Sequence, residues 1–128
     1  MLGAITGDII GSIYESPLNN IKRKDFPLFK PKSHFTDDTV LTIAIADGLL
    51  NNKSYTEQLK TYYRRYPNAG YGANFQRWAA SDQTEPYYSF GNGSAMRVSP
   101  ISYWFNDLET VKMEARKSND PRSFFKIG

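Results

Sequence analysis

The chain has 128 residues, of which 40% are hydrophobic and 15% aromatic, and its net charge is +3. We treat residues 1–128 as a single domain, because this length suits one domain and this composition excludes a disordered tail. The absence of cysteine and the single histidine exclude disulfides, thiolate metal sites and multi-histidine zinc sites. Basic residues are scattered in short groups, so no nucleic-acid partner is expected. No membrane partner is expected either, since no apolar run is long enough for a span, and without a signal peptide the expected compartment is the cytoplasm.

The first predicted element is an amphipathic helix over residues 3–15, where isoleucines recur at spacings of three and four. The same segment carries a glycine at every fourth position: Gly3, Gly7 and Gly11. Each glycine inside a helix costs about 1 kcal/mol relative to alanine, so the repeat predicts a face that another backbone approaches closely. Asp8 and Glu15 lie two turns apart on one side and can share a polar cleft. Prolines and asparagines then predict a long irregular connection over residues 16–35.

The next segment, Phe35-Thr36-Asp37-Asp38-Thr39, places two carboxylates and two hydroxyls at the first turn of a helix predicted over residues 37–50. Oxygen ligands packed this densely suit a hard divalent cation such as Mg²⁺ or Mn²⁺. The same pattern also fits a helix start without metal, with Thr36 as N-cap and both aspartates at the positive end of the dipole. Cap signals are the commoner of the two, and the segment alone leaves both open. The helix itself is apolar around most of its circumference, which predicts a buried position at the centre of the fold.

The remainder of the chain also has helical periodicity, and no alternating strand pattern occurs, so the predicted fold class is all-α. Further helices are predicted over residues 54–65, 74–80, 94–105 and 108–117. The first of these begins with a capping box formed by Ser54 and Glu57. The third is interrupted near Pro100. Polar loops are predicted over residues 67–72 and 81–90, and a tail over residues 118–128.

A second informative block, Gly91-Asn92-Gly93-Ser94-Ala95-Met96-Arg97, has a glycine-rich turn that opens onto a helix. Free backbone N–H groups at such a turn can receive an anion such as a phosphate. The signal is weak by itself, because Asn-Gly is also an ordinary turn and Ser94 an ordinary cap. It is not a P-loop, since no Gly-Lys-Ser/Thr follows. Met96 fits a core position better than a ligand contact, and Arg97 can serve as an ion-pair partner.

Three segments now follow one another along the chain: Gly3 to Asp8 with Gly11 and Glu15, then Phe35 to Thr39, then Gly91 to Arg97 with Pro100. Together they resemble the N-terminal part of the ADP-ribosylglycohydrolase family, which includes the dinitrogenase reductase-activating glycohydrolases. The resemblance spans residues 3 to about 117. It implies an orthogonal all-α fold and a dinuclear Mg²⁺ or Mn²⁺ site that cleaves the glycosidic bond between ADP-ribose and an acceptor.

The resemblance also implies roles for individual residues. Thr36, Asp37 and Asp38 match the first group of metal ligands. Glu15 matches an acidic residue that acts at the reaction centre in some members, so Glu15 and Asp38 are the predicted catalytic residues. The residues predicted to line the ADP-ribose pocket are Gly91, Asn92, Gly93, Ser94 and Met96. The expected partner is accordingly ADP-ribose or an ADP-ribosylated acceptor.

The chain also departs from the family pattern. The C-terminal Asp-x-Asp-Thr motif, which supplies the other half of the metal site, does not occur after residue 100, and residues 118–121 stand where a Thr-His pair is usual. We therefore expect a truncated or degenerate member that is inactive alone. A non-catalytic ADP-ribose-binding or protein-interaction module and a structural remnant without ligand are the alternatives. Uncovered apolar positions on the helix over residues 37–50 are expected to favour self-association into a homo-oligomer.

Overall fold

The computed structural model describes residues 1–85, 87 and 91–119, and these residues form helices and connections with no strand. The helices are α1 (Leu2–Gly11), α2 (Asp37–Leu50), α3 (Tyr55–Arg65), α4 (Ala73–Ala80), α5 (Gly93–Met96), α6 (Ser99–Trp104) and α7 (Leu108–Lys117), with 3-10 turns η1 (Ser12–Tyr14) and η2 (Pro17–Asn19). The predicted all-α class is confirmed. Residue 86, residues 88–90 and most of the predicted tail lie outside the described residues. No helix in the described part has both the length and the hydrophobicity that a membrane span requires.

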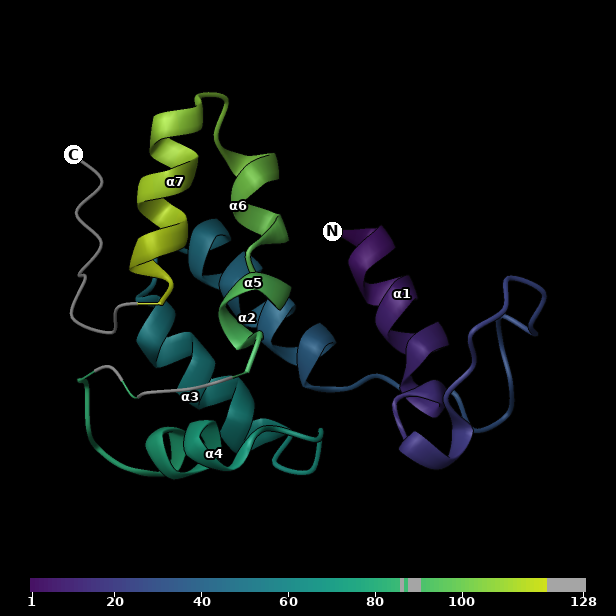
Figure 1. Cartoon of the computed structure of the whole chain (residues 1–128). Coiled ribbons are helices and arrows are strands. Elements are labelled where there is room, and N and C mark those ends of the chain that lie inside the picture. The colour runs from purple at the N-terminus through teal and green to yellow at the C-terminus, as the bar shows by residue number, and fades with distance from the viewer. Residues whose placement is uncertain (86, 88–90, 120–128) are drawn as a thin grey trace.

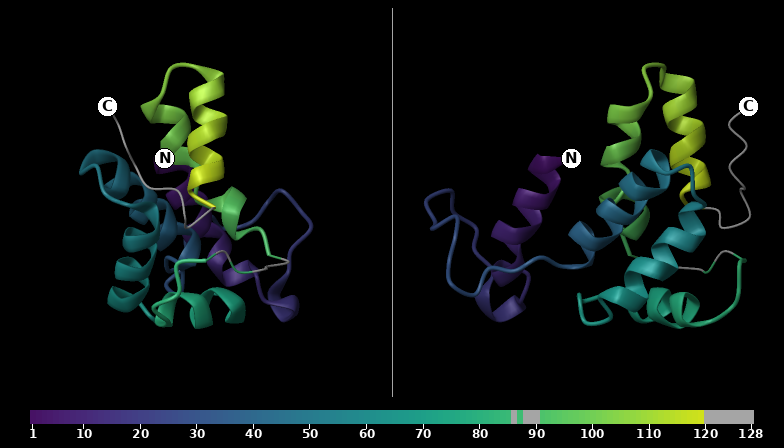
Figure 2. Two further views of the ribbon diagram at one scale, coloured as in Figure 1. Left: turned by 90° about the vertical axis from the view of Figure 1, so that its left-hand side faces the viewer. Right: turned by 180° about the vertical axis from the view of Figure 1, so that it is seen from behind.

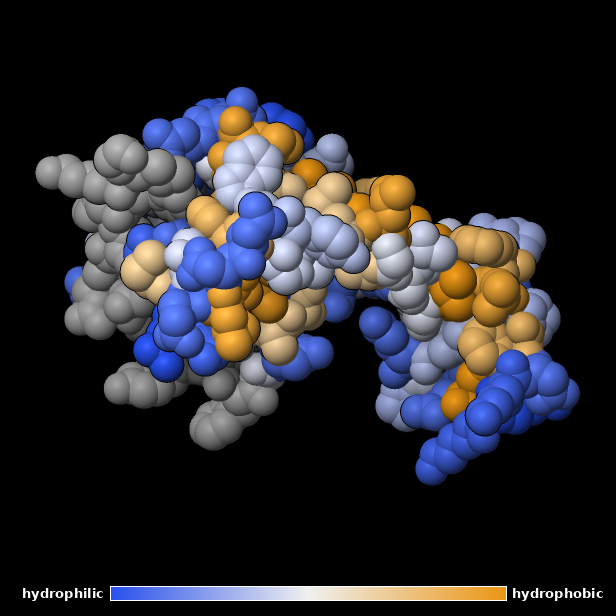
Figure 3. Space-filling view, turned by 90° about the horizontal axis from the view of Figure 1, so that it is seen from above, coloured by the Kyte–Doolittle hydropathy of each residue, from blue (hydrophilic) through white to orange (hydrophobic). Residues whose placement is uncertain are grey.

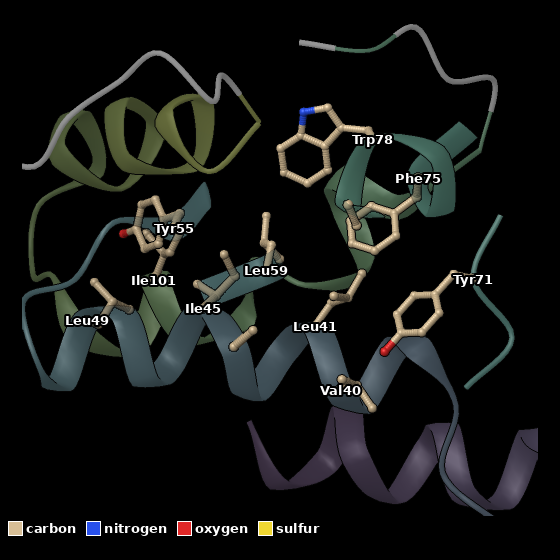
Figure 4. Close-up of a cluster of buried hydrophobic side chains, with 12 residues drawn as sticks. Val40, Leu41, Ile45, Leu49, Tyr55, Leu59, Tyr71, Phe75, Trp78 and Ile101 are labelled. Carbon is tan, nitrogen blue, oxygen red and sulfur yellow. The ribbon is translucent and has the colours of Figure 1, made fainter. Parts of the chain in front are cut away.

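Helix α2 lies at the centre of the fold, as its sequence predicts (Figure 1). It contacts α1, α3, α5 and α6 along its length. Leu41 and Ile45 are 1% and 0% exposed, and Figure 4 shows their side chains among those of α3, α4 and α6. The hydrophobic side chains of the core are Val40, Leu41, Ala44, Ile45, Leu49, Tyr55, Leu59, Tyr71, Phe75, Trp78, Ala79 and Ile101. Burial of a helix that is apolar nearly all round is the main contribution to stability here.

Helices α3 and α4 pack their aromatic side chains against α2. Tyr55 and Leu59 of α3 are buried, as are Phe75 and Trp78 of α4. The Lys60 ammonium lies 4.8 Å from the Trp78 ring centroid and donates to the Trp78 carbonyl at 3.1 Å. Lys60 therefore adds a charged donor to a carbonyl that already accepts from the N–H and the hydroxyl of Ser81 at the end of α4.

One local prediction needs correction and another is confirmed. Ser54 occupies the N-cap position of α3, but its side chain makes no capping hydrogen bond, so the predicted capping box with Glu57 is wrong. The interruption predicted near Pro100 is present, because the helical segment over residues 94–105 divides into α5 and α6 at Arg97 and Val98. Pro100 lies in the first turn of α6, where its missing N–H removes no intrahelical bond.

Helix α1 lies to one side of the other helices, together with residues 12–35 (Figures 1 and 2). None of its residues is buried. A Cβ atom built on Gly3, Gly7 or Gly11 would meet no described atom within 4 Å. The predicted close approach of another backbone to this glycine face is therefore wrong for the part of the chain that the structure describes.

A single carboxylate, Asp8, connects α1 to α2. Its Oδ1 accepts from the Thr36 hydroxyl at 2.5 Å, and its Oδ2 accepts from the Thr36 backbone N–H at 2.8 Å. The same Oδ2 accepts from the Thr39 backbone N–H at 3.2 Å and from the Thr39 hydroxyl at 2.5 Å. Hydrogen bonds to a charged acceptor are about twice as strong as neutral ones. Asp8 thus helps to attach a helix that has no fully buried residue.

Side chains of η1 hold the long connection over residues 16–35 near its middle and near its C-terminal end. Ser12 Oγ accepts from the His34 backbone N–H at 3.1 Å, which returns the chain to the end of α1. The Tyr14 hydroxyl donates to the Pro27 carbonyl at 3.0 Å, and its ring packs edge-on against Phe26 at 5.3 Å. These contacts direct the chain into α2 beside Asp8.

Large apolar side chains remain exposed on α1 with residues 12–35 and also on the other helices. Figure 3 shows apolar residues in orange on the face seen from above. The most exposed are Leu2, Leu18, Leu28, Phe29, Leu50, Tyr103 and Leu108. Within α2 itself only Ile43 and Leu50 are exposed, at 37% and 66%. The self-association predicted from uncovered α2 positions therefore depends on two residues of that helix and stays a prediction.

Replacing Asp8 by Asn tests the connection between α1 and α2. Asn keeps one acceptor oxygen but turns an N–H₂ group toward donors, so we expect the free energy of unfolding in metal-free buffer to fall by about 1–3 kcal/mol. Urea denaturation measures this loss, and hydrogen exchange should show reduced protection in α1. Asp25→Asn is the matched control, since Asp25 is an exposed member of an ion pair with Arg23. An Asp8→Asn protein as stable as the control would contradict this role.

Candidate active site

The first turn of α2 is capped by groups other than its own two aspartates. The Asp37 N–H donates to the Ala69 carbonyl at 2.7 Å, and the Asp38 N–H donates to Thr36 Oγ1 at 3.4 Å. The Thr39 N–H donates to Asp8, as described above. Thr36 is therefore the N-cap, as predicted. The negative charge that accepts hydrogen bonds from this helix end is the Asp8 carboxylate of α1. Asp37 and Asp38 are not needed for capping, and both carboxylates line a neighbouring pocket.

Three carboxylates from three elements meet beside this turn. Asp8 of α1, Glu15 at the end of η1 and Asp38 of α2 each offer an oxygen, and these oxygens all lie within 4.8 Å of one another. The polar cleft predicted for Asp8 and Glu15 is thus present. Asp8 is not among the predicted site residues, although its two-turn spacing from Glu15 is the signal that could have identified it. Asp37, a predicted metal ligand, lies next to this cluster rather than in it.

The crowding of negative charge changes the acidity of these groups. Burial, with a further contribution from the charge of Asp38, raises the pKa of Asp37 to about 6. Burial and the Asp8 charge raise the pKa of Asp38. Desolvation raises the pKa of Glu15, and the charges of Asp38 and Asp8 raise it further. The fold therefore holds Glu15, Asp37 and Asp38 where burial and neighbouring negative charge disfavour their ionised forms.

No described lysine or arginine forms an ion pair with these carboxylates. The ion pairs between described residues lie elsewhere, in the connection after η2 and on α7. Clustered carboxylate oxygens without a protein cation are the donor set that a hard divalent ion such as Mg²⁺ or Mn²⁺ requires. The residues present therefore fit such an ion.

The pocket beside the cluster has a volume of about 530 Å³. It is lined by Glu15, Asp37, Asp38, Leu41, Gly70, Gly72, Ala73, Asn74, Phe75, Tyr87, Gly91, Asn92, Gly93, Met96 and Arg97. Segments that lie far apart in the sequence, from η1, the start of α2 and the glycine-rich turn, thus share one cavity. A cavity of this size accommodates a drug-sized or nucleotide-sized ligand.

The glycine-rich turn lines this pocket, but it does not lead into a long helix. Gly91, Asn92, Gly93 and Met96 are among the lining residues, whereas Ser94 is exposed and is not. The helix that follows, α5, has only four residues. An anion site that depends on the dipole of a long helix is therefore not formed, and the predicted phosphate contact would have to come from the turn itself.

Met96 occupies the predicted position at the core and the pocket, whereas Arg97 does not form the predicted ion pair. Met96 both packs against the core and lines the pocket. Arg97 is 5% exposed and donates to the Ser118 carbonyl and to Asn119 Oδ1, each at 3.3 Å. Its burial lowers its pKa. Among the described residues Arg97 has no carboxylate partner, so the predicted ion pair is not observed there.

A loop that the sequence did not assign to the site, residues 69–72, forms one wall of the pocket. Gly70 adopts a φ of +95°, which favours glycine, and its backbone passes close to the Asp37 carboxylate. A Cβ atom on Gly70 would lie 3.9 Å from Asp37 Oδ1. The Gly-Tyr-Gly spacing in the loop was the available signal, but it is also that of an ordinary turn.

Comparison with known proteins agrees with this geometry. A family model for ADP-ribosylglycohydrolase matches residues 1–120. The chain is 29% identical to ADP-ribosylhydrolase ARH3 from Mus musculus and from Homo sapiens, and each alignment covers 92% of this chain. The alignments cover 41% and 42% of these two relatives, so the chain spans about two fifths of their length. The chain belongs to the ADP-ribosylglycohydrolase family.

Proposed function

We propose that the site hydrolyses the glycosidic bond between ADP-ribose and an acceptor when its metal site is complete. The observation that carries the proposal is the convergence of the acidic cluster and the glycine-rich turn on one pocket. Membership of the family and the similarity to proteins named ADP-ribosylhydrolase support the substrate class.

The residues would divide the chemistry as follows. Thr36, Asp37 and Asp38, with Asp8 beside them, would hold Mg²⁺ or Mn²⁺, which supplies Lewis-acid polarisation and the orientation of ribose hydroxyls when bound. Glu15 would take a proton from water and offset positive charge at the anomeric carbon, work for which a carboxylate of raised pKa is suited. Asp38 would keep the reacting groups in place from the first turn of α2.

The remaining contacts with ADP-ribose would come from the glycine-rich turn and from the loop over residues 69–72. Gly91, Asn92, Gly93 and Met96 line the pocket and would contact ADP-ribose through backbone groups and an apolar side chain. Ser94 is exposed, so its predicted contact with substrate is the least supported of the five. The proposed metal ligands, Asp8, Thr36, Asp37 and Asp38, supply only part of a dinuclear ligand set. A non-catalytic module that binds ADP-ribose is the alternative that the activity test below separates.

The first test concerns metal binding. We expect the chain to bind Mn²⁺ weakly, because part of the ligand set is absent, and the Asp37→Asn/Asp38→Asn variant to show no binding by calorimetry. The fold should be retained, since Asp8 and Thr36 cap α2 and both substitutions remove charges that burial disfavours. Asp107→Asn is a control variant, because Asp107 caps α7 and is remote from the pocket. Unchanged Mn²⁺ affinity in the double variant would show that Asp37 and Asp38 are not ligands.

The second test is the pH dependence of that binding. Protons compete with the cation for carboxylates, and the pKa of Asp37 is about 6. Mn²⁺ affinity should therefore rise between about pH 5 and about pH 7 and level off above it. In the metal-free protein, stability changes with pH in the opposite direction to Mn²⁺ affinity. A raised pKa means that the folded state binds more protons than the unfolded state does. The contribution of Asp37 to the free energy of unfolding should thus fall as the pH rises from about 4, where the unfolded carboxyl titrates, to about 6, where the folded one does, and Asp37→Asn should remove that dependence.

The third test is turnover by the 128-residue chain. With part of the ligand set, it should release no ADP-ribose from ADP-ribosylated arginine or serine above background, as measured by chromatography of the products. Binding of ADP-ribose without turnover would favour the non-catalytic module. Turnover that disappears on chelation and in Glu15→Gln would mean that a second copy of the chain supplies the missing ligands, and the expectation of inactivity would then be wrong.

A further inference from the structure

Tyr71 carries a hydroxyl that the fold does not use. The residue is 4% exposed, and its ring stacks on Phe75 at 5.3 Å and meets the edge of Tyr63 at 5.1 Å. Its hydroxyl oxygen is buried and has no hydrogen-bond partner among the described residues. A phenylalanine would make the same ring contacts without leaving a buried polar group unsatisfied, so the hydroxyl calls for an explanation outside the packing.

The hydroxyl lies on the side of Tyr71 that faces the metal-ligand turn. Figure 4 shows the Tyr71 oxygen directed toward the first turns of α2. The loop of Tyr71 is fixed against that turn, since the Asp37 N–H donates to the Ala69 carbonyl at 2.7 Å. Gly70 brings the backbone so near that its Cβ would lie 3.9 Å from Asp37 Oδ1. The Asp37 charge also contributes, after burial, to a raised pKa of Tyr71, which is consistent with this proximity.

We propose that Tyr71 is a positioning residue whose hydroxyl donates to the Asp37 carboxylate when that carboxylate holds a divalent cation. The inference rests on the proposed metal-dependent function. A carboxylate that binds a cation through one oxygen needs a donor at the other to fix its orientation, and a buried O–H group that donates to no other described residue can fill that place. Removal of such outer donors typically weakens metal affinity by 10-fold to 100-fold.

The experiment compares Tyr71→Phe with Tyr63→Phe, which removes a hydroxyl from the adjoining ring of the same aromatic cluster. Free Mn²⁺ is measured by electron paramagnetic resonance, and the melting temperature is measured with and without Mn²⁺. For Tyr71→Phe we expect an unchanged or higher melting temperature without metal, Mn²⁺ affinity reduced about tenfold or more, and a smaller Mn²⁺-induced shift. Tyr63→Phe should bind Mn²⁺ as the unaltered chain does. A purely structural hydroxyl would lower the metal-free melting temperature and leave the affinity unchanged, and that result would overturn the proposal.

Asp37→Asn separates failure of this proposal from failure of the proposed function. If Asp37→Asn loses Mn²⁺ binding while Tyr71→Phe keeps it within about twofold, Tyr71 has no positioning role and the metal site stands. If the unaltered chain binds no Mn²⁺, both proposals are wrong. If Asp37→Asn binds Mn²⁺ as well as the unaltered chain does, the Tyr71 proposal is wrong, whereas the cluster of Asp8, Glu15 and Asp38 remains available to the ion. The double variant with Asp37→Asn and Tyr71→Phe should bind no worse than Asp37→Asn alone, because the hydroxyl acts only through that carboxylate.

Discussion

The candidate site depends on the carboxylate of Asp8. Both of its oxygens accept hydrogen bonds from the first turn of α2, where Thr36 and Thr39 each supply a backbone N–H and a hydroxyl. Because these bonds satisfy the start of α2 from a different helix, the adjacent aspartates are not required as caps. The same bonds bring η1, and with it Glu15, to within reach of Asp38. One partly buried carboxylate thus attaches α1, caps α2 and assembles the acidic cluster.

The cluster is an unfavourable arrangement for the metal-free protein. Asp37 and Asp38 are partly buried beside other carboxylates, and their pKa values rise as a consequence. A stable core built on α2 offsets this cost, since the side chains of Leu41 and Ile45 are almost entirely removed from water. Like charges held together by a rigid scaffold favour a bound cation, because the cation relieves the repulsion that the fold maintains. The electrostatics therefore support the same function as the family membership does.

Another wall of the pocket comes from the loop over residues 69–72, whose backbone lies against Asp37. Ala69 accepts a hydrogen bond from the Asp37 N–H, and Gly70 adopts the conformation that lets the chain turn beside Asp37. Aromatic stacking in α3 and α4 fixes the position of this loop, since Tyr71 lies between Tyr63 and Phe75. The aromatic cluster thus serves the pocket as well as the core.

The sequence by itself determined the all-α class and the buried position of α2. Residue types also predicted Thr36 as N-cap, which the structure confirms, and a metal motif at Asp37 and Asp38, which stays a prediction. Local patterns could not show that Ser54 makes no capping bond, nor that the glycine face of α1 meets no described backbone. Only the tertiary structure placed the Asp8 carboxylate of α1 against the start of α2, and residues 69–71 against Asp37. These contacts join residues that lie about thirty positions apart along the chain, and their formation depends on how whole helices pack, which no local pattern contains.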